Sequence, residues 1–327
     1  MAERRRWVRW LSWVSAFLGG LLLLGPFLLP LPELDTIPPR ELAEPGDRFV
    51  TLEGIDVRYR VAGADGPTIL LLHGFGANSR SWEPVMATLA EIGRVVAFDR
   101  VGFGLTERPL EWEGDNPYGS PAQLELVVAL MDDLGVETGI LVGHSAGAEV
   151  AAAVTLAHPD RISGLVLESP ALDSGPGPIV RALAATPQGQ RVVRFTGRKA
   201  SDQVYELLAS AYHDPSRITP ETLDGYQQPF RADDWDIGLA HLVASPRLGS
   251  LRDRLTEAKH PLLILTGGED TWVPTADTVE LAGGLPEAEL VVVPNCGHVA
   301  HEECPTAFGE AVSEWLEDRT GDVESSS

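Results

Sequence analysis

Apolar and polar positions alternate along this chain in two different rhythms. Short, nearly continuous apolar runs recur, and between them lie longer segments in which apolar residues return every three or four positions. The first pattern is typical of strands buried on both faces, and the second of helices that bury one face. Together they predict a parallel sheet with helices on both sides. We expect strands at 68–72, 94–98, 139–142, 162–168, 261–265 and 290–293, and helices at 82–91, 121–134, 146–157, 276–282 and 305–318.

Two stretches depart from this rhythm. Residues 48–61 alternate strictly around Glu53-Gly54, which predicts an antiparallel hairpin ahead of the parallel strands. The rhythm is lost again over 172–259, where short helix-like runs carry several aromatic residues. Ligands of parallel sheets bind at the carboxyl ends of the strands, so we interpret this stretch as a cap over that edge. The core then comprises 46–171 and 260–319, and we expect a disordered tail at 320–327.

The N-terminus has a third pattern. Residues 10–31 are apolar and uncharged, and four arginines lie in the basic segment 1–9. About 20 apolar residues cross the hydrocarbon core of a bilayer, and preceding arginines favour the cytoplasmic side. We therefore predict a single-pass membrane anchor with the rest of the chain outside the cytoplasm, joined by a linker over 32–45. The alternative is a secretory signal whose cleavage releases the protein.

Composition narrows the choice of partners. The chain has 327 residues and a net charge of −23, from 25 Lys and Arg against 48 Asp and Glu. This acidity excludes nucleic acid as a partner, since phosphate binding depends on clustered cations. The two cysteines, Cys296 and Cys304, flank a loop that contains histidine. They form either a disulfide that closes this loop or two free thiols, and the sequence leaves both open.

The motif Gly143-His144-Ser145-Ala146-Gly147 lies between the strand at 139–142 and the helix at 146–157. A Gly-x-Ser-x-Gly motif between a strand and a helix predicts a nucleophile elbow, in which a tight turn lifts the serine hydroxyl clear of the sheet. The small neighbours avoid clashes at a strained backbone. Ser145 is therefore the candidate nucleophile.

A serine hydroxyl needs a base, which is usually histidine, and the base needs an acid that holds its tautomer. Among the eight histidines, His298 and His301 lie in the loop after the last predicted strand, and His298, at the start of the loop, is the better base. Asp270 follows a predicted strand and is our choice of acid. Its neighbour Glu269 and, third, Asp173 are the alternatives.

The oxyanion of an acyl-transfer reaction needs backbone donors. The amide of Ala146, directly after the nucleophile, is one candidate. The second is the amide of Phe75, in a glycine-flanked turn after the strand at 68–72. We also predict that four residues near these turns contact the substrate: His73, Gly74, His144 and Trp272.

These motifs occur in the order found in the α/β-hydrolase superfamily, which the chain resembles over about 46–317. The matching segments are His73-Gly74-Phe75-Gly76, Asp99 to Thr106, the elbow motif, Gly268 to Pro274, and Gly297-His298 with Glu303 and Pro305. The resemblance implies an eight-stranded, mostly parallel sheet with an inserted helical cap. It also implies a catalytic triad of Ser145, Asp270 and His298. Serine at the elbow argues against the haloalkane dehalogenase and epoxide hydrolase branches of this superfamily, which use an aspartate there.

The function predicted is hydrolysis of carboxylic esters through an acyl enzyme. Trp272 and the aromatic residues of the cap suggest that the acyl or alkyl part is apolar, and a membrane anchor would bring lipid-derived esters within reach. A hydrolase that cleaves carbon–carbon bonds of ring-fission products is the first alternative, and a non-catalytic binding protein on the same fold is the second. We expect no cofactor. We also expect no metal, since His298 and His301 lack the spacing of four found in helical metal motifs.

Overall fold

The computed structural model describes residues 7, 10, 13–15, 17, 19–21 and 23–324, with the backbone alone over 320–324. Its centre is one eight-stranded sheet in the order β1-β2-β4-β3-β5-β6-β7-β8. Strand β2 runs antiparallel to both of its neighbours, and the other neighbouring strands pair in parallel. The predicted hairpin and parallel sheet are confirmed. The strands are β1 (Arg48–Leu52), β2 (Ile55–Ala62), β3 (Thr68–Leu72), β4 (Arg94–Phe98), β5 (Gly139–His144), β6 (Ile162–Glu168), β7 (Leu262–Gly267) and β8 (Ala288–Val293).

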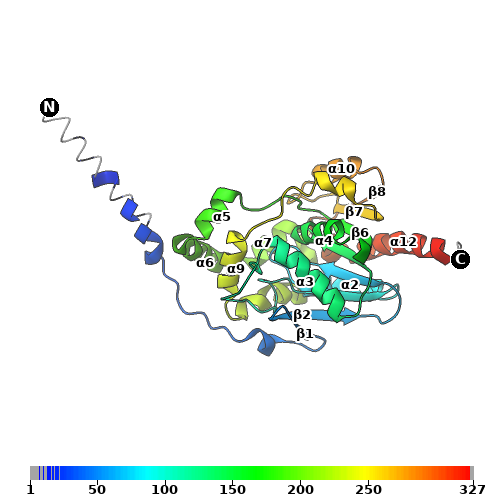
Figure 1. The fold of residues 1–327 in the computed structure, drawn as a ribbon, viewed down its shortest axis with the longest axis horizontal. Coiled ribbons are helices and arrows are strands. Elements are labelled where there is room, and N and C mark those ends of the chain that lie inside the picture. The colour runs from blue at the N-terminus through cyan, green and yellow to red at the C-terminus, as the bar shows by residue number, and fades with distance from the viewer. Residues whose placement is uncertain are drawn as a thin grey trace.

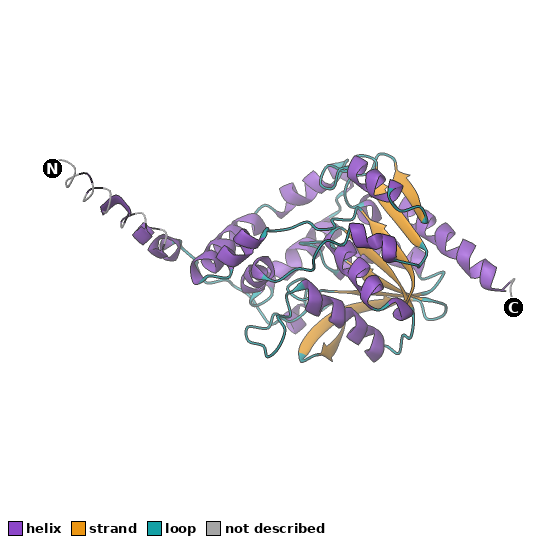
Figure 2. Cartoon of the chain, turned by 45° about the horizontal axis from the view of Figure 1, so that its top comes forward, coloured by secondary structure: helices purple, strands orange, loops and turns teal. Residues whose placement is uncertain are grey.

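Helices cover both faces of the sheet (Figure 2). The apolar residues that point to one face pack against α3, α4 and α10, and those that point to the other pack against α2 and α12. Central strands such as β3 and β5 are buried on both sides, which explains their continuous apolar runs at 69–72 and 140–142. The helices of these two layers are α2 (Glu83–Leu89), α3 (Ser120–Asp133), α4 (Ala146–Ala157), α10 (Thr275–Gly283), α11 (Ala300–Glu303) and α12 (Pro305–Glu324).

Five further helices lie between β6 and β7 in the sequence and form the cap, beside the sheet in Figure 1. Three of them begin with proline at the first position, where the missing N–H would have no partner within the helix anyway. Short 3-10 turns connect several of them. The cap helices are α5 (Pro178–Ala184), α6 (Pro187–Ser201), α7 (Val204–Ala211), α8 (Pro220–Gln227) and α9 (Trp235–Ala244).

The membrane-spanning prediction for 10–31 is wrong. No helix among the described residues has both the length and the apolar character needed to cross a bilayer. The helical turns give way to a 3-10 helix, Gly25–Leu28, which contains Pro26. Beyond it the chain lies along α6, where Arg191 Nη2 donates to the carbonyl of Leu29 at 2.7 Å. The predicted membrane partner, and the location with the body of the chain outside the cytoplasm, are withdrawn with the anchor.

The other terminal predictions concern the basic segment, the linker and the tail. Most of the basic segment 1–9 lies outside the described residues. The linker over 32–45 contains a 3-10 helix, Pro39–Leu42, and Ile37 forms a β-bridge with Ala232 of the cap. Helix α12 continues to Glu324, and 325–327 lie outside the description. The domain boundaries themselves stay predictions.

Candidate active site

Ser145 lies at the tight turn between β5 and α4. Its backbone has φ 51° and ψ −117°, a conformation that L-residues rarely adopt and that marks strain at functional turns. Two glycines make the turn possible. A Cβ on Gly147 would lie 2.2 Å from the carbonyl oxygen of Leu72, and one on Gly143 would lie 2.7 Å from the Cα of Ala148. The motif therefore forms the elbow that the sequence predicts.

The turn opens into a cavity of about 570 Å³. Ser145 and His298 both line this cavity, so the predicted nucleophile and base face one space. Phe75, Ala146 and Trp272 line it as well. Ala146 is the first residue of α4, and the first amides of a helix have no carbonyl partner within it. The Ala146 amide is thus free to act as the predicted oxyanion donor.

His298 is held by Asp270. Its Nδ1 lies 2.9 Å from Asp270 Oδ2, and both side chains are buried. The other oxygen of the carboxylate, Oδ1, accepts the backbone amides of Trp272 at 2.9 Å and Val273 at 3.0 Å. A carboxylate fixed in this way keeps the Nδ1 proton on the imidazole and leaves Nε2 free to accept another. The Trp272 ring stacks on His298, with centroids 5.4 Å apart and planes 28° apart.

The two alternative acids occupy other positions. Glu269 is exposed beside Asp270. Asp173 accepts the Ser250 hydroxyl and the Leu251 amide, both at 2.8 Å, and so fastens the segment that returns from the cap to the core. Asp270 is the one of the three that is hydrogen-bonded to His298.

The remaining predicted contact residues divide into two groups. His144 lines the cavity, and its Nε2 lies 3.0 Å from the carbonyl of His298. His73 is fully buried behind the cavity wall, where Nδ1 bonds the Gly74 carbonyl and Nε2 accepts the Arg100 amide. Gly74 allows close approach, because a Cβ there would lie 2.8 Å from His144 Nδ1. Substrate contact by these residues stays a prediction.

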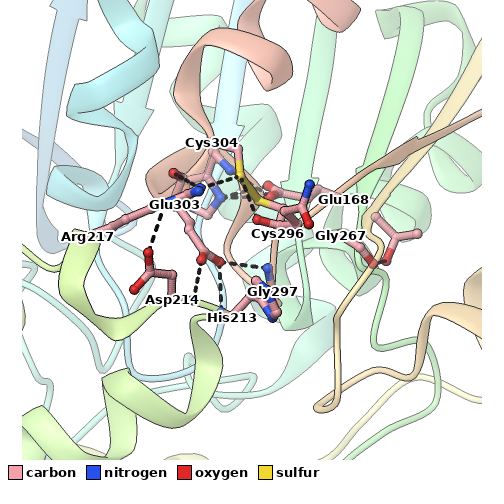
Figure 3. The surroundings of a disulfide bond; sticks show 12 residues. Glu168, His213, Asp214, Arg217, Gly267, Cys296, Gly297, Glu303 and Cys304 are labelled. Atoms are coloured by element: carbon pink, nitrogen blue, oxygen red, sulfur yellow. Dashed lines mark hydrogen bonds and ion pairs between the residues drawn. A yellow bond between two sulfur atoms is a disulfide. The ribbon is translucent and has the colours of Figure 1, made fainter.

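The loop that carries His298 is fixed at both ends (Figure 3). Cys296 and Cys304 form a disulfide across it, which settles the question that the sequence left open. The buried carboxylate of Glu303 accepts backbone amides from three residues, at 2.7 Å from Gly297, 3.0 Å from His213 and 2.7 Å from Asp214. The last two belong to the cap, so one carboxylate joins the cap to the histidine loop.

A buried acid–histidine network below the cavity was missed by the sequence analysis. Glu168, at the end of β6, accepts both the amide and Nδ1 of His301 at 3.0 Å. Burial raises the pKa of Glu168 to about 7 and lowers the pKa of His301 to about 3. The neighbouring Glu302 accepts hydroxyls from Tyr212 and Tyr226, and burial raises its pKa to about 8. The run His301-Glu302-Glu303 in the sequence was the available signal.

Part of this network could approach a metal ion. Ligand atoms of His144, Glu168 and His301 lie within 4.8 Å of one another. His301 Nδ1 is hydrogen-bonded to Glu168, and an ion bound through Nδ1 would have to displace that hydrogen bond. The buried His301 Nε2 and His144 Nδ1 have no hydrogen-bond partner among the described residues.

Comparison with known proteins places this geometry in a family. Residues 67–305 match the family described as the alpha/beta hydrolase fold. The chain is 30% identical over 280 residues to 2-hydroxymuconate semialdehyde hydrolase of Pseudomonas sp. (strain CF600), covering 82% of this chain and 93% of the relative. It is 28% identical to a 2-hydroxy-6-oxononadienedioate/2-hydroxy-6-oxononatrienedioate hydrolase of Paraburkholderia phymatum, covering 81% and 93%.

The fold of this chain is also similar to that of a solved hydrolase structure. The 2-hydroxy-6-oxo-6-phenylhexa-2,4-dienoate hydrolase of Rhodococcus sp. strain RHA1 superposes with a TM-score of 0.66 at 25% identity, covering 83% of this chain and 99% of that one. The predicted fold is confirmed. The chain belongs to the alpha/beta hydrolase fold family.

Proposed function

We propose that this protein is a serine hydrolase that cleaves a carbon–carbon bond in a ring-fission product. The observation that carries the proposal is the agreement among relatives aligned over about four fifths of the chain, which are hydrolases of 2-hydroxymuconate semialdehyde and of 2-hydroxy-6-oxo dioates. This reverses the order given by the sequence alone, in which esters came first and carbon–carbon bonds second.

The arrangement of side chains supports the chemistry. The 2-hydroxy dienoate first tautomerises: its enol hydroxyl loses a proton and the carbon beside the ketone gains one, which gives the keto form R–CO–CH2–R′. His298 Nε2 then takes the Ser145 proton, and Oγ attacks the ketone carbon of this form. The amides of Ala146 and Phe75 stabilise the oxyanion. The carbon–carbon bond then breaks with its electron pair on the CH2 carbon, which His298 protonates to CH3. Water, deprotonated by the same histidine, releases R–COOH from Ser145, so one water is consumed in each turnover.

Ester hydrolysis is the second candidate. Its two acyl-transfer steps need the same nucleophile, base and oxyanion donors, and an alkoxide leaves more readily than a carbanion. A carbon leaving group therefore requires further stabilisation in the R′ part of the substrate, such as the conjugated 2-oxo acid that forms from a ring-fission product. The two candidates differ in the substrate and not in the triad.

The test compares two substrates on the purified protein and its Ser145→Ala variant. Loss of the visible absorbance of 2-hydroxy-6-oxo-6-phenylhexa-2,4-dienoate reports carbon–carbon cleavage, and release of p-nitrophenol from p-nitrophenyl butyrate reports ester cleavage. We expect the dienoate to give the higher kcat/KM and Ser145→Ala to abolish both reactions. Turnover of the ester alone would restore the ester hypothesis. Turnover of neither, with no labelling of Ser145 by a fluorophosphonate, would favour a binding protein.

A further inference from the structure

The segment 23–44 connects the outside of the cap to the sheet. In Figure 1 it passes α6 and then runs to β1. Five prolines lie between 26 and 39, and a chain rich in proline is extended and stiff. Outside its two short 3-10 helices, such a chain makes few hydrogen bonds within itself. Its backbone carbonyls are therefore available to partners elsewhere in the protein.

The carboxyl-terminal end of this segment is bound to the core. Arg40 Nε donates to Asp56 Oδ2 of β2 at 2.8 Å. The backbone amide of Glu44 donates to Asp47 Oδ2 at 2.8 Å. Asp47 in turn forms a buried ion pair with Arg58 of β2, with Nη2 and Oδ1 2.7 Å apart. These contacts fix this end of the segment to the sheet.

The middle of the segment is bound to the part of the cap that precedes α9. The amide of Ile37 donates to the carbonyl of Arg231 at 3.0 Å, and the carbonyl of Ile37 accepts the amide of Asp233 at 2.9 Å. The buried side chain of Gln228 donates to the carbonyl of Leu42 at 3.0 Å. The segment therefore joins this end of the cap to the core.

The amino-terminal part of the segment lies along α6. Three polar side chains of α6 donate to its backbone carbonyls, at sequence spacings of three and seven that place the donors on one face of the helix. The three bonds are Gln188 Nε2 to Leu23, Arg191 Nη2 to Leu29 and Arg198 Nη1 to Pro32. The apolar side chains contribute little, since Leu24 is 66% and Leu28 81% exposed. This contact rests on hydrogen bonds, which can break without unpacking a core.

Another part of α6 forms a wall of the cavity beside Ser145. Gly197, Ala200 and Ser201 of α6 line this cavity. A Cβ on Gly197 would lie 2.5 Å from Cδ2 of Leu239, which belongs to α9 and also lines the cavity. The two helices are thus packed closely where they enclose the substrate space. An outward shift of α6 would widen that space, and the segment bound to α6 opposes such a shift.

We propose that residues 23–44 form a strap that holds α6 over the cavity, and that this strap sets how large a substrate reaches Ser145. The core end of the strap is fixed by ion pairs and the α6 end by bonds to carbonyls, so the α6 end is the one that releases. The proposal rests on the proposed function only for the use of the cavity as the substrate site.

The first test is independent of any reaction. Hydrogen exchange followed by mass spectrometry compares the full-length protein with its Gln188→Ala/Arg191→Ala variant, which loses two of the three donors. Alanine favours helix, so the substitutions do not weaken α6 itself. We expect the amides of α6 to exchange about 3- to 10-fold faster in the variant, and those of β3 and β5 to be unchanged. Lys199→Ala, which removes an exposed cation from the same helix, is the control and should have no effect.

The second test measures access to Ser145. Two fluorophosphonates, one with an ethyl group and one with a biphenylmethyl group, label the serine of the same three proteins. The small probe should react at similar rates in all of them. The ratio of the large-probe rate to the small-probe rate should rise about 3- to 10-fold in Gln188→Ala/Arg191→Ala and stay constant in Lys199→Ala.

Each outcome bears on the proposal. Unchanged exchange of α6 in the double variant would overturn the strap. Faster exchange with a constant labelling ratio would show that the strap holds α6 without selecting for size, and would overturn that part. An equal effect of Lys199→Ala would also contradict the proposal. If neither probe labels Ser145 in any of the proteins, the proposed reaction is rejected, and hydrogen exchange alone still decides whether the strap exists.

Discussion

The floor and the roof of the cavity are built in different ways. The floor comprises the loops at the carboxyl edge of the sheet, with Ser145, Asp270 and His298. The side chains of Asp270 and His298 are buried and held by hydrogen bonds of 2.9–3.0 Å. The roof comprises the cap helices α6, α7 and α9, which contribute mainly apolar side chains, and one of them, Leu207, is 54% exposed. Directional bonds fix geometry and apolar contacts tolerate change, so we expect the floor to set the chemistry and the roof to set the fit.

The sharpest test of the floor is Asp270→Asn. The amide of the variant donates a hydrogen bond to His298 Nδ1, so the imidazole proton moves to Nε2. A protonated Nε2 cannot accept the Ser145 proton. We expect kcat/KM to fall by about 10⁴-fold with little change in KM. The matched control is Asp173→Asn, at a carboxylate that binds the return segment of the cap. A larger loss from Asp173→Asn than from Asp270→Asn would show that the acid has been misassigned.

Below the floor, Glu168→Gln should change how stability depends on pH. Burial raises the pKa of Glu168 to about 7, so the folded protein keeps this proton up to about pH 7, whereas the unfolded chain releases it near the ordinary glutamate pKa of 4.5. The folded state therefore binds more protons in this window, and its stability falls as the pH rises through it. Glutamine does not titrate, so the variant lacks this pH dependence. Between pH 4.5 and 7, the free energy of unfolding of the wild type should therefore fall by about 3 kcal/mol relative to that of the variant.

Urea unfolding at pH 4.5, 6 and 8 measures this difference. Glu269→Gln, at an exposed carboxylate near the same edge of the sheet, is the control and should give a difference that is flat with pH. A constant difference between Glu168→Gln and the wild type would mean that Glu168 is ionised throughout the range.

Loss of the disulfide should affect stability more than chemistry. The Cys296–Cys304 bond closes a loop with a sequence separation of 8, for which chain entropy gives a stabilisation of about 2–3 kcal/mol. The Cys296→Ser/Cys304→Ser protein should therefore melt at a lower temperature yet keep kcat within a few-fold, because Glu303 still binds the Gly297 amide. Wild type treated with dithiothreitol serves as the comparison. A drop in kcat as large as that of Asp270→Asn would place the disulfide among the essential constraints of the floor.

The smallest effect is expected in the roof. Leu207→Ala removes a side chain that lines the cavity but is half exposed, so unfolding free energy should change by less than about 0.5 kcal/mol. The lost apolar contact should raise KM a few-fold for substrates with a large apolar group and leave kcat unchanged. Steady-state kinetics with short and long p-nitrophenyl esters measures this. A fall in kcat would contradict the expectation that the floor sets the chemistry and the roof sets only the fit of the substrate.

The same division explains what the sequence could predict. Ser145, Asp270 and His298 lie at the ends of strongly patterned strands, where spacing alone places them at one edge of the sheet. The partners of Glu303 depend on the packing of the cap, which no periodicity specifies. The apolar run at 10–31 led to a wrong prediction because hydropathy reports only how apolar the residues are. It does not report that the helical turns give way to a 3-10 helix that contains Pro26, or that Arg191 binds the chain beyond it.

The three amides that share Glu303 also limit how a substrate can enter. His298 N donates to the carbonyl of Ala211, the last residue of α7, at 2.7 Å, and the cap residues that follow it donate to Glu303. If the end of α7 moved outward as a gate, it would also break the hydrogen bond that holds His298, the proposed base. Entry that keeps the base in place must therefore hinge elsewhere. The α5–α6 end of the cap, where Ile179 and Leu183 are exposed, carries no such tie to the His298 loop among the hydrogen bonds of the described residues.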